Sequence, residues 1–95
     1  MPSPLPDITI QRELGSLPGW SRRGAVLTKS YTLGSFRAAI ETVRRVADVA
    51  GSADHHPDID IRGNRLLFTL STHDAGGVTQ KDIELAREIE RIVRA

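Results

Sequence analysis

One apolar stripe in the middle of the chain has the spacing of an amphipathic helix. Its apolar residues recur at three- and four-residue steps: Phe36, Ala39, Ile40, Val43, Val46, Ala47 and Ala50. Charged residues of both signs occupy most of the other positions, as expected for a solvated helix face. Ser35 is the expected N-cap, and Gly51 is the expected C-terminal end of this helix.

Strands are predicted on both sides of this helix. Ile59 and Ile61 alternate with charged residues, which is the period of a half-buried strand over residues 58–62. Gly63-Asn64 predicts a hairpin turn, and a return strand follows over residues 65–72. In that return strand Leu66, Phe68 and Leu70 share one face, whereas Leu67, Thr69, Ser71 and His73 share the other. Residues 20–22 and the β-branched run over residues 25–33 predict an earlier hairpin around Arg23-Gly24.

Helices are also predicted near both ends of the chain. The C-terminal helix opens at Thr79, and Asp82 three residues later resembles the partner group of a capping box. A short helix is expected over residues 9–14, with Asp7 or Thr9 as its cap and Gly15 at its end. The proline-rich residues 1–6 are expected to form a loose tail.

The resulting order is α-β-β-α-β-β-α in a single domain that spans residues 1–95. Hairpins imply an antiparallel sheet, and helices must cover its apolar face. We therefore expect the α+β class, with a four-stranded antiparallel sheet of two hairpins and three helices on one face. Because so small a core gains from association, we expect a homo-oligomer that uses the edge strands and the Leu67 side of the sheet.

The composition excludes several classes of protein. The 95 residues include 13 basic and 12 acidic side chains, and this balance argues against a dedicated nucleic-acid binder. The absence of cysteine excludes disulfides, thiolate metal sites and a cysteine nucleophile. No apolar run approaches the roughly 20 residues of a membrane helix, and no secretory signal pattern is visible. A cytoplasmic protein with no membrane association is the expectation.

The candidate chemistry lies in the three histidines. His55 and His56 precede the strand over residues 58–62, and His73 follows its partner strand, so the hairpin brings all three to one end of the sheet. Pro57 favours extended backbone at His56, so the two adjacent rings should point to opposite sides. Histidine can transfer protons at neutral pH, and three imidazoles can also bind zinc. Adjacent ligands are poorly placed for one metal ion, however, and each histidine alone could simply be a loop or core residue.

Other polar residues near this end have simpler interpretations. Asp74 could orient a histidine, but an aspartate next to two glycines is more often a turn former. Asp82 is most simply a helix-capping group. Gly76-Gly77 before a helix is a weak sign of phosphate binding, and a tight turn explains the pair as well.

Together, the segments DHHPDIDI, NRLLFTLSTHDAGGVTQKD and LAREI resemble the pterin-4a-carbinolamine dehydratases. The resemblance extends from Leu17 to the C-terminus, and its specific part is the block from the histidine pair to Thr79. It implies a small antiparallel sheet with helices on one side, a homodimer or homotetramer, and dehydration of a 4a-hydroxytetrahydropterin without a cofactor. The implied product is a quinonoid dihydropterin, formed in the recycling of tetrahydropterin cofactor.

The resemblance also implies roles for individual residues. His55, His56 and His73 match the catalytic histidines of the family, with His55 and His73 in proton transfer and His56 mainly in pterin binding. Loss of water requires an acid at the 4a-hydroxyl and a base at the ring nitrogen, which suits these side chains. The substrate-binding residues by this resemblance are His55, His56, Pro57, Ser71, Thr72, His73 and Asp74, and Asp82 is a supporting residue.

Some positions depart from the family pattern. Gly51 stands four residues before His55, where members often carry glutamate, and Gly63 stands where an aromatic residue is common. Ile59 replaces a tryptophan of some members. The departure at Gly51 supports an alternative function, in which a non-catalytic relative serves as an assembly factor or dimerising coactivator for another protein. The three retained histidines favour the enzyme.

Overall fold

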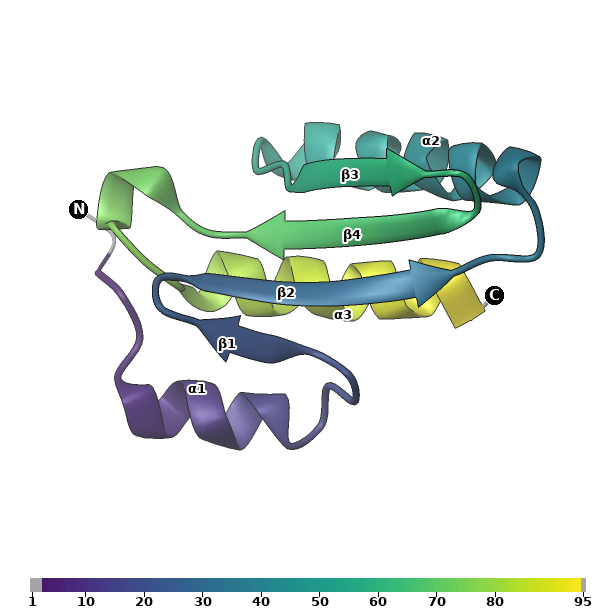
Figure 1. Ribbon diagram of the computed structural model, residues 1–95. Helices are drawn as coiled ribbons and strands as arrows, with labels where there is room; N and C mark the ends of the chain where they lie inside the picture. Colours follow the sequence, from purple (N-terminus) through teal and green to yellow (C-terminus); the bar gives the residue numbers. More distant parts are fainter. Residues whose placement is uncertain (1–2, 95) are drawn as a thin grey trace.

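Two antiparallel hairpins form the sheet of this protein, and helices cover one of its faces (Figure 1). The computed structural model describes residues 3–94. Its elements are α1 (Asp7–Leu14), β1 (Ser21–Arg23), β2 (Val26–Thr32), α2 (Phe36–Ala53), β3 (Asp58–Arg62), β4 (Arg65–Leu70), a short 3₁₀ turn (His73–Ala75) and α3 (Gln80–Arg94). This order confirms the predicted α+β arrangement, α-β-β-α-β-β-α.

The two hairpins join through their second strands. The strand order is β1-β2-β4-β3, and β2 pairs with β4 in an antiparallel register that places Leu27 opposite Leu70 and Tyr31 opposite Leu66. Both β1 and β3 are therefore edge strands within the described residues. β3 and β4 form an antiparallel hairpin, so β3 starts at the same end of the sheet at which β4 ends (Figure 1).

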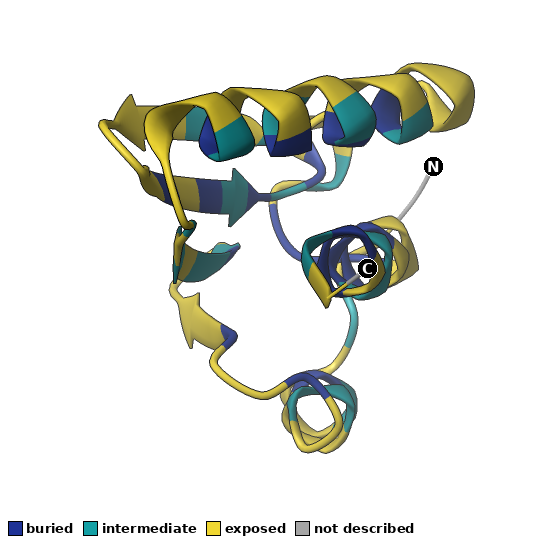
Figure 2. Cartoon of the chain, turned by 90° about the vertical axis from the view of Figure 1, so that its right-hand side faces the viewer, coloured by how far each residue is buried: buried dark blue, intermediate teal, exposed yellow. Residues whose placement is uncertain are grey.

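The alternation along β4 separates the core from the outer face, as predicted. Leu66, Phe68 and Leu70 are completely buried, whereas Leu67 between them is 38% exposed. The buried residues of α2 and α3 face the interior between the helices and the sheet (Figure 2). The apolar core is thus a single layer between the helices and one sheet face, and the other face is left uncovered in this protomer.

The predicted end of α2 at Gly51 is wrong, although its predicted beginning is confirmed. The Ser35 side chain accepts a hydrogen bond from the Ala38 amide at 3.0 Å. The helix continues through Gly51 to Ala53 and ends on Asp54, which has a φ of 51°. Aspartate tolerates this left-handed conformation better than most residues, so no glycine is needed there. Gly51 and the residues up to Asp54 are exposed, but Ala50 before them is buried, and the Asp54 amide closes the last turn on the Ala50 and Gly51 carbonyls.

The N-terminal segment also differs in detail from the prediction. Pro6 is the N-cap of α1 without any side-chain cap, so neither Asp7 nor Thr9 has the expected role. The Asp7 carboxylate instead pairs with Arg22 at 2.6 Å. The Leu5 amide donates to the Val78 carbonyl at 2.8 Å, which ties part of the expected loose tail to the loop before α3. Residues 1 and 2 lie outside the described residues.

A buried polar cluster connects α3 to β2. The Lys29 ammonium and the Tyr31 hydroxyl both donate to the same carboxylate oxygen of Glu90. Burial raises the pKa of Tyr31, and its hydrogen bond to Glu90 raises it further. Burial also raises the pKa of Glu90, but the hydrogen bonds from Lys29 and Tyr31 outweigh it and hold that pKa below its usual value.

Within residues 3–94, no helix has the length and apolar character needed to cross a membrane.

Candidate functional site

Asp82 lies at the centre of a buried hydrogen-bond network at the start of α3. Its side chain is completely buried. One carboxylate oxygen, Oδ2, accepts hydrogen bonds from the Thr79 amide and from the Thr72 hydroxyl, each at 2.9 Å. The bond from the Thr79 amide is the one in which the third helical residue of the predicted capping box accepts from the N-cap amide. Thr72 belongs to the segment after β4, so Asp82 connects that segment to α3.

The other oxygen of Asp82 binds a histidine from a third segment. Oδ1 lies 2.7 Å from His55 Nε2, and the His55 side chain is 12% exposed. The His55 amide donates to the Ala50 carbonyl at 3.1 Å, so the residue is fixed directly after α2. The left-handed turn at Asp54 makes this possible, because it reverses the chain at the helix end. Burial strengthens such a hydrogen bond, since little water competes for either group.

Thr72 supports this network from behind and is itself held by the following loop. Its hydroxyl is also 2.7 Å from the Thr79 hydroxyl, and the residue is 6% exposed. Its amide donates to the Gly77 carbonyl at 2.9 Å, while its carbonyl accepts from Ala75 and Gly76. These bonds engage both backbone groups of Thr72 within the protein. The structure therefore places Thr72 as a residue that holds Asp82, and its contact with substrate stays a prediction.

The three histidines lie at one end of the sheet but in different environments. The segments that carry His55 and His56, before β3, and His73, after β4, meet at the same end (Figure 1). The Thr72–Asp82–His55 chain of hydrogen bonds links these segments and ends one residue from His73. The rings of His56 and His73 are exposed, whereas that of His55 is partly buried. The return strand was predicted to end at residue 72, but β4 ends at Leu70 and His73 begins the 3₁₀ turn.

The other predicted binding residues flank the same end of the sheet. Pro57 and Ser71 are half-buried at the start of β3 and after β4, and Asp74 is exposed in the 3₁₀ turn. No side-chain hydrogen bond engages Ser71 or Asp74 within residues 3–94. Their polar side chains are therefore not engaged by other side chains of the described residues.

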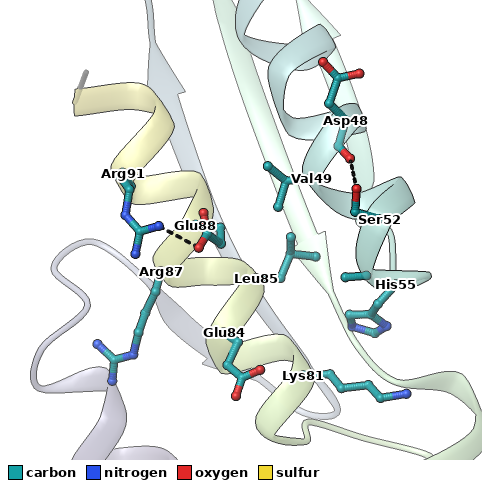
Figure 3. Close-up of a pocket in the computed structure, with 11 residues that line it drawn as sticks. Asp48, Val49, Ser52, His55, Lys81, Glu84, Leu85, Arg87, Glu88 and Arg91 are labelled. Atoms are coloured by element: carbon teal, nitrogen blue, oxygen red, sulfur yellow. Dashed lines mark hydrogen bonds and ion pairs between the residues drawn. The ribbon is translucent and has the colours of Figure 1, made fainter.

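An open cleft of about 940 Å³ lies between the C-terminal part of α2 and the first turns of α3 (Figure 3). His55 lines it, but His56 and His73 do not. The α2 side contributes Asp48, Val49, Ser52 and Ala53, and the α3 side contributes Lys81, Glu84, Leu85, Arg87, Glu88 and Arg91. The cleft thus has an apolar floor at Val49 and Leu85 and a rim of charged groups of both signs.

Two charged groups beside His55 were missed by the sequence analysis. Lys81 and Glu84 line the cleft and have no ion-pair partner among the described residues, whereas Arg91 pairs with Glu88 at 2.7 Å. The only signal in the sequence was their place in the first turns of α3, next to its apolar side. That signal does not show which flank faces α2, because it depends on how the two helices pack.

The described part of the chain contains no group of three or more histidine, aspartate or glutamate side chains with the arrangement of a metal site. Asp82 contacts His55, and its two oxygens are already engaged by three protein groups. What the site offers is a partly buried imidazole with a fixed partner, two exposed imidazoles, and an adjacent cleft. This combination is suited to binding a small polar molecule and moving protons on it.

Comparisons with known proteins agree with this chemistry. Residues 3–92 match the family model described as "Pterin 4 alpha carbinolamine dehydratase". Two proteins named "Putative pterin-4-alpha-carbinolamine dehydratase" are similar in sequence. The one from Roseiflexus sp. (strain RS-1) is 48% identical over 98% of this chain and 100% of its own length. The one from Nocardia farcinica is 50% identical over 95% of each chain.

Solved structures show the same fold. A transcriptional coactivator/pterin dehydratase from Brucella melitensis superimposes with a TM-score of 0.93 at 31% identity, over 96% of this chain and 99% of its own. A pterin dehydratase-like RuBisCO assembly factor of the alpha-carboxysome shares the fold at a TM-score of 0.65 and 15% identity, over 78% of this chain and 86% of its own. The family match and the near full-length relatives lead to one conclusion: the chain belongs to the pterin-4-alpha-carbinolamine dehydratase family.

Proposed function

We propose that this protein is a hydro-lyase that removes water from a 4a-hydroxytetrahydropterin to give a quinonoid dihydropterin. The family membership supports the reaction class. The observation that carries the proposal for this chain is the His55 imidazole, held by the buried Asp82 carboxylate at 2.7 Å beside an open cleft. A histidine that only filled space would not need an ionisable partner at that depth.

The reaction requires two proton movements around one carbon atom. The bond between the 4a-carbon and its hydroxyl oxygen breaks, and that oxygen takes a proton and leaves as water. The adjacent ring nitrogen loses its proton, and the electron pair of that N–H bond forms the new carbon–nitrogen double bond. One proton is gained and one is lost, so no redox partner or bound metal is needed.

His55, His56 and His73 supply the groups for these movements. His55 and His73 carry protons, and His56 mainly binds the pterin. His56 and His73 are exposed and lie next in sequence to His55 and Thr72, the two ends of the hydrogen-bond chain through Asp82. Pro57, Ser71 and Asp74 complete the proposed binding surface. Thr72 and Asp82 support it through their mutual hydrogen bond.

A stopped-flow assay of quinonoid product tests this proposal on the wild type and on the His55→Ala, His56→Ala and His73→Ala variants. General acid–base catalysis typically contributes on the order of 10²–10⁴-fold, so each proton-transfer variant should lose about 10²-fold or more in rate. Circular dichroism would verify that each variant folds. A wild type that forms product no faster than buffer does would refute the enzyme, whereas folded His55 and His73 variants with full rates would refute the assignment of residues.

The alternative is a non-catalytic protein that assists the assembly of another protein or acts as a dimerising coactivator. Gly51 favours this alternative, because a carboxylate common in the family is absent there. A pterin dehydratase-like RuBisCO assembly factor shares the fold, which is compatible with this alternative. An inactive wild type that co-purifies with one defined protein would support it.

We further propose that two copies associate through the β3 edge and the neighbouring flank of α2, which keeps the expected edge strand but not the expected Leu67 side of the sheet. Phe36, Ile40 and Ile61 are 59%, 41% and 38% exposed, and they lie toward the same end of the sheet, where α2 begins and β3 ends (Figure 1). The outer edge of β3 has no strand partner among the described residues. An antiparallel edge can pair with its own copy across a two-fold axis, so a second copy would cover both features at once.

A further inference from the structure

The Asp82 carboxylate is oriented by two hydrogen bonds to its Oδ2 oxygen. The Thr79 backbone N–H can only donate, and it points at Oδ2 from 2.9 Å. The Thr72 hydroxyl donates to the same oxygen at 2.9 Å. Oδ1 is therefore left for His55 Nε2 at 2.7 Å. Because the side chain is completely buried, no water competes for either oxygen.

This arrangement restricts the imidazole as well. An ionised carboxylate can only accept hydrogen bonds, so the contact with Oδ1 requires a proton on Nε2. If the proton of the neutral ring moved to Nδ1, two lone pairs would face each other at 2.7 Å in a buried place. No protein group hydrogen-bonds Nδ1 among residues 3–94, so this nitrogen has no competing partner.

We propose that Asp82, clamped by Thr72 and Thr79, is a positioning residue that fixes His55 in the tautomer with its proton on Nε2. Nδ1 is then the nitrogen that exchanges a proton with the substrate. The first statement concerns the free protein, whereas the second rests on the dehydratase function proposed above. The two threonines take part because their hydrogen bonds to Oδ2 leave Oδ1 to face the ring.

The proton balance follows from this assignment. In the neutral ring Nδ1 has a lone pair and takes a proton from the pterin ring nitrogen. In the resulting imidazolium, Nε2 keeps its own proton and its bond to Asp82, and the added positive charge lies next to a carboxylate. Nδ1–H then returns the proton to water or to the departing hydroxyl. Asp82 loses and gains no proton in the cycle, so it acts only through His55.

Asp82→Asn gives a sharp test, because the clamp determines how the amide must sit. Its oxygen has to face the Thr79 N–H, since an NH₂ group there would oppose another donor. The NH₂ group is then directed at His55 Nε2, which must become the acceptor. The neutral ring is forced to carry its proton on Nδ1, and the lone pair needed for proton transfer faces the wrong way.

The experiment is long-range ¹H–¹⁵N NMR on protein with ¹⁵N-labelled histidine, recorded at a pH at which the rings are neutral. The His→Ala variants assign the three rings. We expect His55 to be protonated on Nε2 in the wild type and on Nδ1 in Asp82→Asn. Asp7→Asn makes the same chemical change at a carboxylate that pairs only with Arg22, and it should leave the His55 spectrum unchanged. Wild-type His55 with its proton on Nδ1, or a mixture of both tautomers, would overturn the proposal.

The wild-type spectrum decides the tautomer even if Asp82→Asn fails to fold. Thr72→Val then offers a milder perturbation, because it removes one donor to Oδ2 and leaves the Thr79 amide in place. His55 should keep its proton on Nε2, because the carboxylate still only accepts, but its Nε2–H resonance should shift as the carboxylate loses one of the two groups that hold Oδ2. A Thr72→Val spectrum identical to the wild type would remove Thr72 from the clamp.

An activity measurement separates this proposal from the proposed function. If the wild type is a dehydratase, Asp82→Asn should lower kcat on the order of 10²-fold with little change in KM, because the ring is present but wrongly protonated. Asp7→Asn should keep the wild-type rate. A folded Asp82→Asn protein with the reversed tautomer and full activity would refute Nδ1 as the working nitrogen. An inactive wild type with the expected tautomer would refute only the dehydratase.

Discussion

Gly51 offers a direct test of how α2 ends and of whether a carboxylate at this position changes the rate. It lies in the last turn of α2, two residues before Ala53, and does not have a positive φ. A Cβ atom added at this position would meet nothing within 4 Å. Gly51→Ala therefore adds no clash and removes only the backbone freedom of glycine in the unfolded chain. The gain in helix propensity should raise the free energy of unfolding by about 0.5–1 kcal/mol.

Gly63 provides the matched control. An added Cβ would also meet nothing within 4 Å there, but Gly63 has a φ of +60° in the turn between β3 and β4. Alanine strains that conformation, so Gly63→Ala should lower the free energy of unfolding by about 1 kcal/mol. The two variants make the same chemical change in equally open surroundings, and only the backbone conformation differs.

Urea unfolding followed by circular dichroism measures both effects. For a domain of this size, 1 kcal/mol corresponds to a shift in Tm of about 4–8 °C, so thermal unfolding should show opposite shifts for the two variants. An unchanged m-value would show that the denatured state is the same. If Gly51→Ala destabilises the protein as Gly63→Ala does, the helical conformation at Gly51 is refuted, and with it the extension of α2 to Ala53.

Gly51→Glu adds the functional half of this test. Gly51→Gln is the matched control, because it has nearly the same size and lacks only the charge, so a change in rate between Gly51→Glu and Gly51→Gln belongs to the carboxylate. A charged hydrogen bond to the substrate is worth about 1.5–3 kcal/mol, which predicts a gain in kcat/KM of about tenfold or more. Equal rates for the glutamine and glutamate variants would show that a carboxylate at position 51 has no role in the reaction.

Two further predictions concern stability and association. The pKa of Glu90 is lowered in the folded protein, so the unfolded state binds more protons at acidic pH. The stability that Glu90 contributes is therefore present above its unfolded pKa of about 4.3 and is lost as the pH falls through the folded pKa. Glu90→Gln should therefore destabilise the protein at pH 7, with a difference from the wild type that shrinks toward pH 3 in urea unfolding; a difference independent of pH would contradict this. Ile61→Lys should convert the proposed oligomer to monomer in analytical ultracentrifugation at micromolar concentration, whereas Leu67→Lys, equally exposed on the uncovered sheet face, should not. Monomeric wild type, or dissociation by Leu67→Lys alone, would refute the proposed interface.

Local patterns in the sequence determined most of the elements. The alternation of Leu66, Phe68 and Leu70 with Leu67 predicted which face of β4 is buried, and the structure confirms it. Ser35 and Thr79 predicted where α2 and α3 begin, since an N-cap acts on amides only two or three residues away. The hairpin at Gly63-Asn64 also placed the histidine-bearing segments at one end of the sheet, because two strands joined by a short turn must return to their starting point.

Contacts between distant segments decided the rest. The pairing of β2 with β4 joins residues far apart in sequence, and either hairpin alone is compatible with other strand orders. Gly51 is helical because packing and the turn at Asp54 override its own preference, and no local signal reports this. The sequence pattern predicted Asp82 only as a helix cap, and the family resemblance added a supporting role without naming its partner. Its bond to His55 spans 27 positions and exists only where α2, α3 and the loop after β4 meet. The cleft beside His55 likewise depends on how α2 and α3 pack, which side-chain patterns on each helix alone do not determine.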